Sequence, residues 1–507
     1  MNKQEVESAF QELTSLRRKV ADLDAVESLL GWDQQVKMPP KGAEQRTRQL
    51  AILAEIMHRE DTNPRVGELL GQLQQAEQSL NGAISDDQKV LLREWAREWK
   101  LATALPEAFA SESAATASDA YACWIEARGK NDFSHFLPSM KKIIDLKFRQ
   151  CEYFGMQDRP YDSLLDLFDP GLTVEKVESL FKPLHVDLVA ILKKITEKNV
   201  SVRTDLLQRE WPEENQRALA TELVTRFGFD FEAGRVDTSP HPFCSGSMND
   251  IRLTTRYNES DPRMALFGLC HEAGHGMYEQ GFNHETWGTP LSGSMGMAIH
   301  ESQSLFWEDY ISRSPAFWDF AWPLAKQHFP EQLHDVSQEE WILFCNEVKP
   351  SLIRVEADEV TYPLHIIVRF EIERDIFNGS LKPDDVRQRW NELYVEYLGI
   401  DPPDDNHGVL QDVHWSFAFG YFPSYALGKL IAAMWWNKLR GEMDLDGLAA
   451  KGEFSPILGW MRENIHRQGK RYWAPELVKR AAGKELSSED YLGYLKHKFY
   501  PLYGVEG

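Results

Sequence analysis

Apolar side chains recur at three- and four-residue steps along most of this 507-residue chain, and that spacing limits its fold more than any other feature. One stripe begins near the N-terminus with Leu13, Leu16 and Val20 and continues to Leu30. Similar stripes recur in residues 85–130, 140–155, 173–197 and 380–398. Because such steps place side chains on one face of a helix, we predict a mostly α-helical protein.

Proline-rich breaks divide the stripes without dividing the chain. Met38-Pro39-Pro40 is expected to end a helix, and residues 401–406 break the pattern before the C-terminal quarter. We find no fixed-period repeat, no coiled-coil heptad and no linker rich in Gly and Ser. The prediction is a single domain over residues 1–507, in which the helices could form two lobes.

Residues 244–257 follow a different pattern. Their β-branched residues, their alternation and the flanking Pro and Gly favour a short strand or hairpin. Asp250 and Arg252 lie two residues apart and would share one face of that strand. We expect them to form a structural ion pair.

The balance of charge excludes some partners. The chain has 79 acidic and 56 basic side chains, for a net charge of −23. Nucleic acids and anionic lipid surfaces both require basic protein surface, so neither is an expected partner. The N-terminal residues lack an apolar segment, and Lys429 interrupts the most apolar late stretch, residues 424–436.

The cysteines indicate the compartment. Five are scattered along the chain with no Cys-x-x-Cys pair: Cys123, Cys151, Cys244, Cys270 and Cys345. An odd number without pairing argues against a disulfide framework and against a thiolate metal site. We therefore expect a reducing, cytoplasmic setting.

His271-Glu272-Ala273-Gly274-His275 is an HExxH motif. Asp261-Pro262 and Gly281 provide start and stop signals around it, so it is expected on a helix. There the two imidazoles lie about 40° apart on one face, as two ligands of one metal must. Glu272 is offset by about 100°, close enough to address a water without binding the ion. This pattern favours a catalytic zinc site.

A third ligand is expected 26 residues after His275, at Glu301. A predicted helix over residues 295–310 would carry Glu301 toward the first helix, giving two histidines and one carboxylate. His300 would point about 100° away from Glu301, so we expect it to support the ligands without binding the metal. Cys270 is expected to be a small packed residue.

Six separated motifs make the chain resemble the M32 family of metallocarboxypeptidases. They are His241-Pro242-Phe243; Asp250-Ile251-Arg252-Leu253-Thr254; His271 to His275; His300-Glu301-Ser302-Gln303; Ile353-Arg354-Val355-Glu356-Ala357-Asp358; and Gly408-Val409-Leu410-Gln411-Asp412-Val413-His414-Trp415. The resemblance implies a large helical, two-lobed peptidase with a deep groove, a small β-hairpin or sheet beside the zinc site, and homodimers. It also implies release of single residues from the free C-termini of peptides, with broad specificity.

Cleavage of a peptide bond assigns roles to these residues. Glu272 would take a proton from the attacking water and pass it to the leaving amine. By its match to the family pattern, His414 would donate to the developing oxyanion. A phenol from Tyr421 or Tyr425 could assist it, and the sequence does not separate the two.

An exopeptidase must also bind the free α-carboxylate of its substrate. Arg354 is our candidate, because a guanidinium grips a carboxylate with two parallel hydrogen bonds. Asp358, four residues later, could pair with Arg354 along a helix and orient it. Arg252 is the competing cation.

Other activities remain open at this point. An endo-oligopeptidase would use the same zinc site, and a non-catalytic helical interaction protein could bind a metal through the same motif. Co²⁺ or Mn²⁺ could occupy the same ligands.

Overall fold

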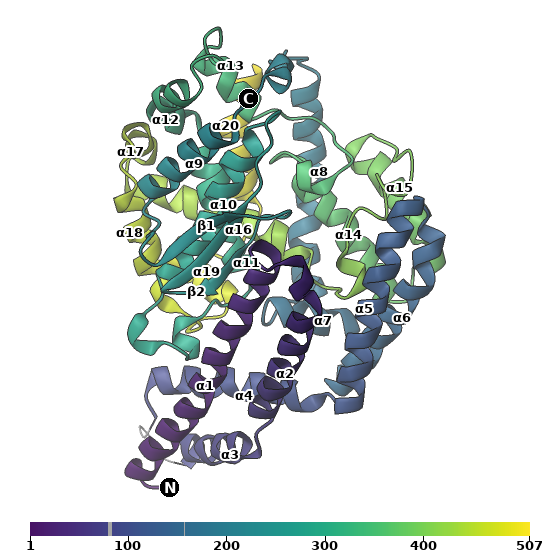
Figure 1. Ribbon diagram of the computed structural model, residues 1–507, viewed down its shortest axis with the longest axis vertical. Coiled ribbons are helices and arrows are strands. Elements are labelled where there is room, and N and C mark those ends of the chain that lie inside the picture. Colours follow the sequence, from purple (N-terminus) through teal and green to yellow (C-terminus); the bar gives the residue numbers. More distant parts are fainter. Residues whose placement is uncertain (80–83, 157, 507) are drawn as a thin grey trace.

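The computed structural model describes residues 1–79, 84–156 and 158–506, and helices dominate it (Figure 1). The α-helices in these ranges are α1 (Lys3–Val36), α2 (Ala43–Asp61), α3 (Pro64–Ser79), α4 (Asp86–Ala104), α5 (Glu107–Lys130), α6 (Phe133–Tyr153), α7 (Pro160–Phe168), α8 (Val174–Thr196), α9 (Glu213–Phe227), α10 (Arg263–Gln280), α11 (Met297–Leu305), α12 (Pro315–His328), α13 (Gln338–Cys345), α14 (Tyr362–Phe377), α15 (Val386–Leu398), α16 (Pro423–Glu442), α17 (Leu445–Lys451), α18 (Ser455–Asn464), α19 (Ala474–Ala482) and α20 (Glu489–Tyr503). The prediction of a mostly α-helical fold is confirmed. No helix in the described ranges is long and apolar enough to cross a bilayer.

A small sheet accompanies the helices. Its strands are β1 (Gly234–Thr238), β2 (Cys244–Ser247) and β3 (Asp250–Thr255), in the order β1-β3-β2. β2 and β3 form the predicted antiparallel hairpin. Sequence reasoning missed β1, which pairs in parallel with β3, because Val236 is its only large apolar residue and gives no alternating pattern.

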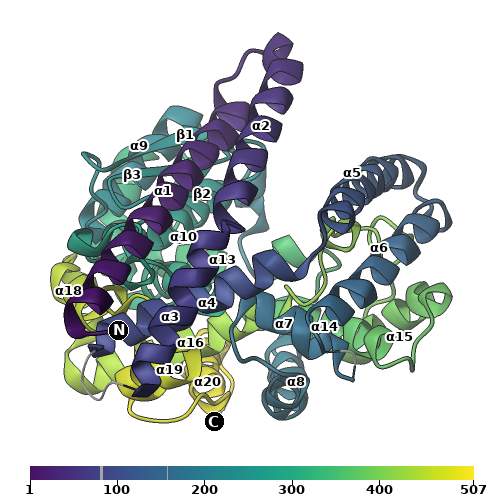
Figure 2. The ribbon, with the colours of Figure 1, turned by 90° about the horizontal axis from the view of Figure 1, so that it is seen from below.

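The helices form two lobes. Figure 2 shows the sheet, α9, α10 and the α1–α2 pair in one lobe, and α5, α6, α14 and α15 in the other. One continuous apolar core includes buried residues of both lobes, such as Leu269 and Leu393. A second, smaller core lies between α1, α3 and α4 around Leu13, Leu73 and Trp95.

The N-terminal stripe is only partly buried. Leu13 and Val20 are 0% and 5% exposed, as a core-facing stripe requires. Val26 and Leu29, later in the same stripe, are 48% and 40% exposed, so only the first half of the stripe is buried. The end of α1 that joins α2 projects from its lobe (Figure 2).

Close packing around α11 fixes the centre of the first lobe. A side chain on Gly274 of α10 would approach Cα of Ser304 to 2.6 Å, and one on Gly428 of α16 would approach Cγ of Glu301 to 2.7 Å. Glycine at both positions therefore lets α10 and α16 pack directly against α11. This contact holds Glu301 between two helices.

Candidate active site

His271 and His275 of α10 face Glu301 of α11. Oε2 of Glu301 lies 3.8 Å from Nε2 of His271 and 3.5 Å from Nε2 of His275. One ligand atom from each residue lies within 4.8 Å of the others. Within the described ranges, this is the only group of three or more His, Cys, Asp or Glu side chains with that geometry. The sequence-predicted ligands are therefore brought together.

The protonation of the cluster fits a divalent cation. Burial disfavours the charged imidazole of His271, but Glu301 and Glu308 outweigh burial and raise its pKa to about 10. Burial, reinforced by His300, lowers the pKa of His275 to about 3. The carboxylates that favour a proton on His271 would also favour a divalent cation beside it. Two imidazoles and one carboxylate suit a catalytic zinc site.

Glu308 supports the first ligand from behind. Its Oε2 lies 2.9 Å from Nδ1 of His271, which leaves Nε2 of His271 facing Glu301. Its Oε1 accepts a hydrogen bond of 2.9 Å from Arg313. Glu308 lies in a π-helical turn, Phe306–Ser312, that continues α11. A carboxylate that holds the second nitrogen of a metal-ligating histidine fixes its orientation and raises its basicity.

Glu272 lies beside the cluster without joining it. It is 7% exposed, and burial raises its pKa to about 7. His300 also stays out of the ligand set, as expected. Its ring stacks on His275 at 4.4 Å, and its Nε2 lies 3.0 Å from Oε1 of Glu279. Cys270 is fully buried, as predicted for a packed residue.

Arg354 is buried, and the predicted partner is wrong. Its Nε and one terminal nitrogen lie 3.0 and 2.9 Å from Oδ1 of Asp412, and its other terminal nitrogen donates to the Tyr362 hydroxyl at 2.9 Å. Asp358 instead accepts backbone N–H groups of residues 349, 360 and 361. The i+4 pairing fails because Arg354 lies in a short 3₁₀ turn, Arg354–Glu356, and not in an α-helix.

Asp412 is shared by two arginines. Arg369, which is fully buried, donates from Nε to Oδ2 of Asp412 at 2.6 Å and also binds the side chain of Gln411. Burial opposes ionisation of Asp412, but Arg354 and Arg369 hold its pKa well below the usual range. Two guanidinium groups and one carboxylate leave this cluster with one uncompensated positive charge.

His414 and the two candidate tyrosines meet in one aromatic group. The His414 ring lies 5.4 Å from Tyr421 and 6.4 Å from Tyr425, and the two phenol rings are 5.2 Å apart. Burial, with the charges of Arg354 and Arg369, lowers the pKa of His414 to about 4. His414 is therefore a neutral imidazole near neutral pH, and both tyrosines remain candidates.

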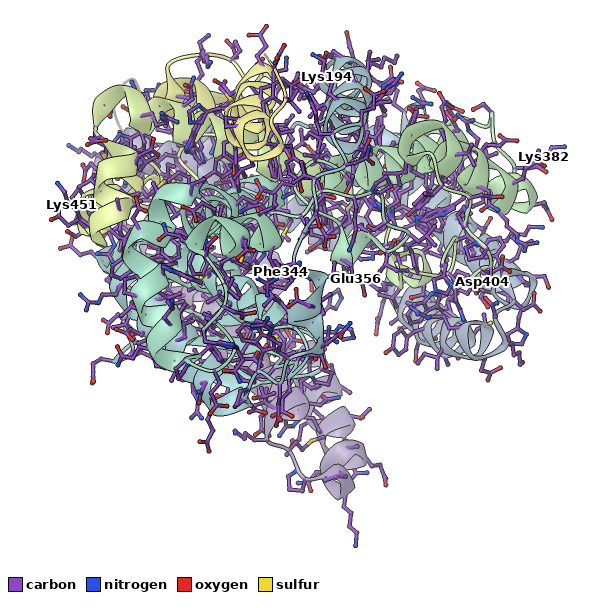
Figure 3. The ribbon with its side chains drawn as sticks, turned by 90° about the horizontal axis from the view of Figure 1, so that it is seen from above. Lys194, Phe344, Glu356, Lys382, Asp404 and Lys451 are labelled. Carbon is purple, nitrogen blue, oxygen red and sulfur yellow. The ribbon has the colours of Figure 1, made fainter. Side chains whose placement is uncertain are left out.

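Tyr362 connects the Arg354–Asp412 cluster with the aromatic group that contains Tyr425. Its ring lies 6.3 Å from that of Tyr425, and its hydroxyl binds Arg354. Burial raises the pKa of Tyr362, and the charge of Glu301 contributes to that rise. In Figure 3, Glu356, two residues after Arg354, lies toward the middle of the molecule, between Lys451 of the first lobe and Asp404 of the second.

Comparison with known proteins decides the family. The family model described as "Carboxypeptidase Taq (M32) metallopeptidase" matches residues 12–499. The chain belongs to the M32 family. It is 41% identical to thermostable carboxypeptidase 1 of Thermus thermophilus, covering 98% of this chain and 99% of the relative. It is 38% identical to carboxypeptidase 1 of Bacillus subtilis, covering 98% and 99%. The M32 carboxypeptidase structure from Deinococcus radiodurans matches with a TM-score of 0.94 at 37% identity, covering 98% and 100%.

The M32 assignment confirms the predicted family and its activity: the protein is a metallocarboxypeptidase, a hydrolase that uses a divalent metal ion. The non-enzymatic alternative is thereby excluded. Sequence reasoning missed three residues of this M32 site: Glu308, Tyr362 and Arg369. Only tertiary contacts connect them to the ligands and to Arg354, and none lies in a motif that the sequence singled out.

Proposed function

We propose that the metal of this carboxypeptidase is zinc, held by His271, His275 and Glu301, one ion per chain. The proposal is supported by two imidazoles and one carboxylate within ligand distance of each other. Co²⁺ and Mn²⁺ remain alternatives, since all three donors also accept these ions. When bound, zinc polarises the scissile carbonyl and the attacking water.

Glu272 is the proposed general base and acid. Its carboxylate lies beside the ligand cluster and is buried, and its pKa near 7 suits both directions of proton transfer at neutral pH. It takes a proton from the attacking water and gives it to the amine of the departing residue. Neither step requires Glu272 to bind the metal.

Arg354 is the proposed receptor for the free α-carboxylate of the substrate. This assignment carries the direction of cleavage, because a cation that binds the free α-carboxylate selects the C-terminal end of the peptide. Asp412 and the Tyr362 hydroxyl hold the guanidinium in one orientation, so little conformational entropy is lost when the substrate binds. Arg252 is the poorer candidate, because its guanidinium stacks on Trp32 of α1, whereas that of Arg354 lies 5.2 Å from the ring of Tyr425 in the aromatic group of His414.

His414, with Tyr421 or Tyr425, is proposed to stabilise the oxyanion. A neutral imidazole can donate one N–H group, and a buried phenol keeps its proton for donation. The aromatic surroundings leave the His414 side chain only 15% exposed, which strengthens such hydrogen bonds.

We further propose that the peptide enters between the two lobes and that cleavage accepts many C-terminal residues. The whole chain, residues 1–507, would act as a single peptidase domain, and the working form would be a homodimer in a reducing, cytoplasmic setting. One continuous core across the lobes supports the single domain, and five unpaired cysteines support the reducing setting.

A digestion time course tests these proposals. The substrate is a pool of peptides with free C-termini, each matched by a C-terminally amidated copy, and the products are read by mass spectrometry. We expect stepwise loss of single residues from the free peptides only, abolished by a chelator and restored best by zinc. Cleavage of the amidated copies at internal bonds would favour the endo-oligopeptidase instead. Size-exclusion chromatography with light scattering tests the homodimer.

A further inference from the structure

Glu373 of α14 is a buried carboxylate that holds three separate segments. It is 0% exposed. Its Oε2 accepts from the Tyr161 hydroxyl of α7 and from the backbone N–H of Gly420, each at 2.7 Å. Its Oε1 accepts from Nε1 of Trp415 at 2.7 Å. Within the described ranges, no lysine or arginine forms an ion pair with it.

Two of the three donors lie immediately inside the proposed oxyanion-binding residues in the sequence. Trp415 directly follows His414, and Gly420 directly precedes Tyr421. Apart from the 3₁₀ turn His414–Ser416, the chain between them is irregular until α16 begins. Helical backbone hydrogen bonds within the loop are confined to this first turn, where Phe417 and Ala418 donate to the carbonyl of His414, and one carboxylate joins the two ends of the loop.

The backbone at Gly420 supports the same contact. Its φ angle is +88°, a conformation that favours glycine, and a side chain there would approach the backbone of Leu164 to 2.7 Å. The loop therefore lies directly on α7, whose Tyr161 donates the third hydrogen bond to Glu373. The carboxylate, the loop and α7 form one connected unit.

A carboxylate is a costly way to fill space in an apolar core. Burial raises the pKa of Glu373 to about 7, and its three hydrogen bonds and the charge of Arg369 offset part of the cost of ionisation. At Glu373 all three compensating donors are directed at the carboxylate, and two of them come from the loop. Precise loop geometry would explain why a carboxylate is buried here, because misplacement of a catalytic group by about 1 Å can reduce a rate about 100-fold.

We propose that Glu373 is a positioning residue that sets His414 and Tyr421 for catalysis by holding both ends of the 414–421 loop. The inference rests on the proposed function of these two residues. Glu373 itself contacts neither substrate nor metal ligands. Its effect must therefore pass through the loop.

The test is Glu373→Gln, with Glu371→Gln as the matched control. Glu371 lies on the same helix and also accepts from a tyrosine hydroxyl, that of Tyr397 at 2.8 Å, but it has no contact with the loop. The glutamine at 373 keeps one acceptor oxygen and turns an amide donor toward another donor. We expect kcat on a free peptide to fall about 10- to 100-fold, with KM changed less than about threefold. Bound metal and circular dichroism should stay as in the wild type, and Glu371→Gln should keep the wild-type kcat.

A combined variant separates positioning from general damage. If Glu373 acts through the loop, adding Glu373→Gln to a protein that already carries His414→Ala and Tyr421→Phe should lower kcat less than about twofold further. An equal fold loss in both backgrounds would overturn the proposal, and so would a wild-type kcat for Glu373→Gln while His414→Ala is impaired. If His414→Ala and Tyr421→Phe both retain full kcat, the proposed oxyanion function itself fails, and with it this inference.

A milder variant covers the case in which Glu373→Gln does not fold. Trp415→Phe keeps an aromatic side chain and the carboxylate, and it removes the indole N–H that donates to Glu373 together with part of the buried ring. We expect kcat about fivefold below that of the wild type, again with little further loss in a protein that already carries His414→Ala and Tyr421→Phe. An unchanged kcat in Trp415→Phe would contradict the proposal.

Discussion

The two halves of the candidate active site have opposite charge. Around the predicted metal ligands, carboxylates predominate: Glu272, Glu301 and Glu308 accompany the imidazoles of His271 and His275. Around Arg354, cations predominate, because Asp412 is shared with Arg369. One half is complementary to a cation and the other to an anion.

The pKa values of His271 and His414 show the difference in charge between the two halves most directly. Glu301 and Glu308 outweigh burial and raise the pKa of His271 to about 10. Burial, aided by two arginines, lowers the pKa of His414 to about 4. The same side chain therefore carries a proton in one half and loses it in the other. A C-terminal peptide needs both environments, since its scissile carbonyl goes to a metal and its carboxylate to a cation.

Replacement of Glu272, in the half that contains the candidate metal ligands, should cause the largest loss of activity. Glu272→Gln keeps the shape but cannot accept a proton, so kcat/KM should fall about 10³- to 10⁴-fold. Zinc content, measured by mass spectrometry of the intact metal complex, should remain near one per chain. Glu285→Gln, an exposed glutamate just beyond α10, is the control. Wild-type hydrolysis by Glu272→Gln would exclude its role as the base.

Replacement of Arg354 should break the second half. Arg354→Lys keeps the charge but cannot bind Asp412, the Tyr362 hydroxyl and a substrate carboxylate together, so kcat/KM on free peptides should fall about 100-fold or more. The preference for free over amidated peptides should shrink by a similar factor. Arg374→Lys is the matched control, because Arg374 forms surface ion pairs with Glu178 and Asp375. If the variant keeps the wild-type preference, another cation binds the carboxylate.

Glu308 tests whether the carboxylates of the first half serve the metal. Glu308→Gln weakens the partner of His271 Nδ1, so we expect zinc to bind 10- to 100-fold more weakly, by a range typical of such supporting residues. Competition with a fluorescent zinc chelator measures this affinity. An unchanged affinity would mean that Glu308 serves only Arg313 and the π-helical turn.

The sequence predicted the first half better than the second, for a physical reason. His271, Glu272 and His275 lie within one helical turn and a half, where spacing alone determines which side chains share a face. The prediction of Glu301 as the third ligand required only one further helix. The partners of Arg354 lie 8 to 58 residues away in sequence, so no local period connects them.

The wrong prediction for Asp358 follows from the same limit. A pairing at i+4 presupposes an α-helix, and the chain at Arg354 forms a short 3₁₀ turn instead. The strand β1 was missed because its partner, β3, supplies the pairing that its own residues do not indicate. Local periodicity thus predicted the helices, the hairpin and the three candidate metal ligands, while contacts across the core determine the partners of Arg354 and the pairing of β1.

The smallest expected effect concerns His414 and stability. Its pKa is about 4 in the folded chain and near 6.5 when unfolded, so between these values the unfolded state binds more protons. Acidification through this range must therefore destabilise the fold. From pH 6.5 to pH 5 we expect His414 to contribute a loss of about 1.5 kcal/mol in the free energy of unfolding.

The variant His414→Gln isolates that contribution, because other titrating groups are common to both proteins. Urea denaturation of wild type and variant at pH 6.5 and pH 5 should show a smaller loss for the variant, by the stated amount. His334→Gln, at a histidine whose side chain is 71% exposed, is the surface control for the substitution itself. If His414→Gln lost as much stability as the wild type, His414 would be able to hold a proton beside Arg354. The half around Arg354 would then hold a third positive charge. The difference in charge between this half and the carboxylate-rich metal half would depend on Arg354 and Arg369 alone.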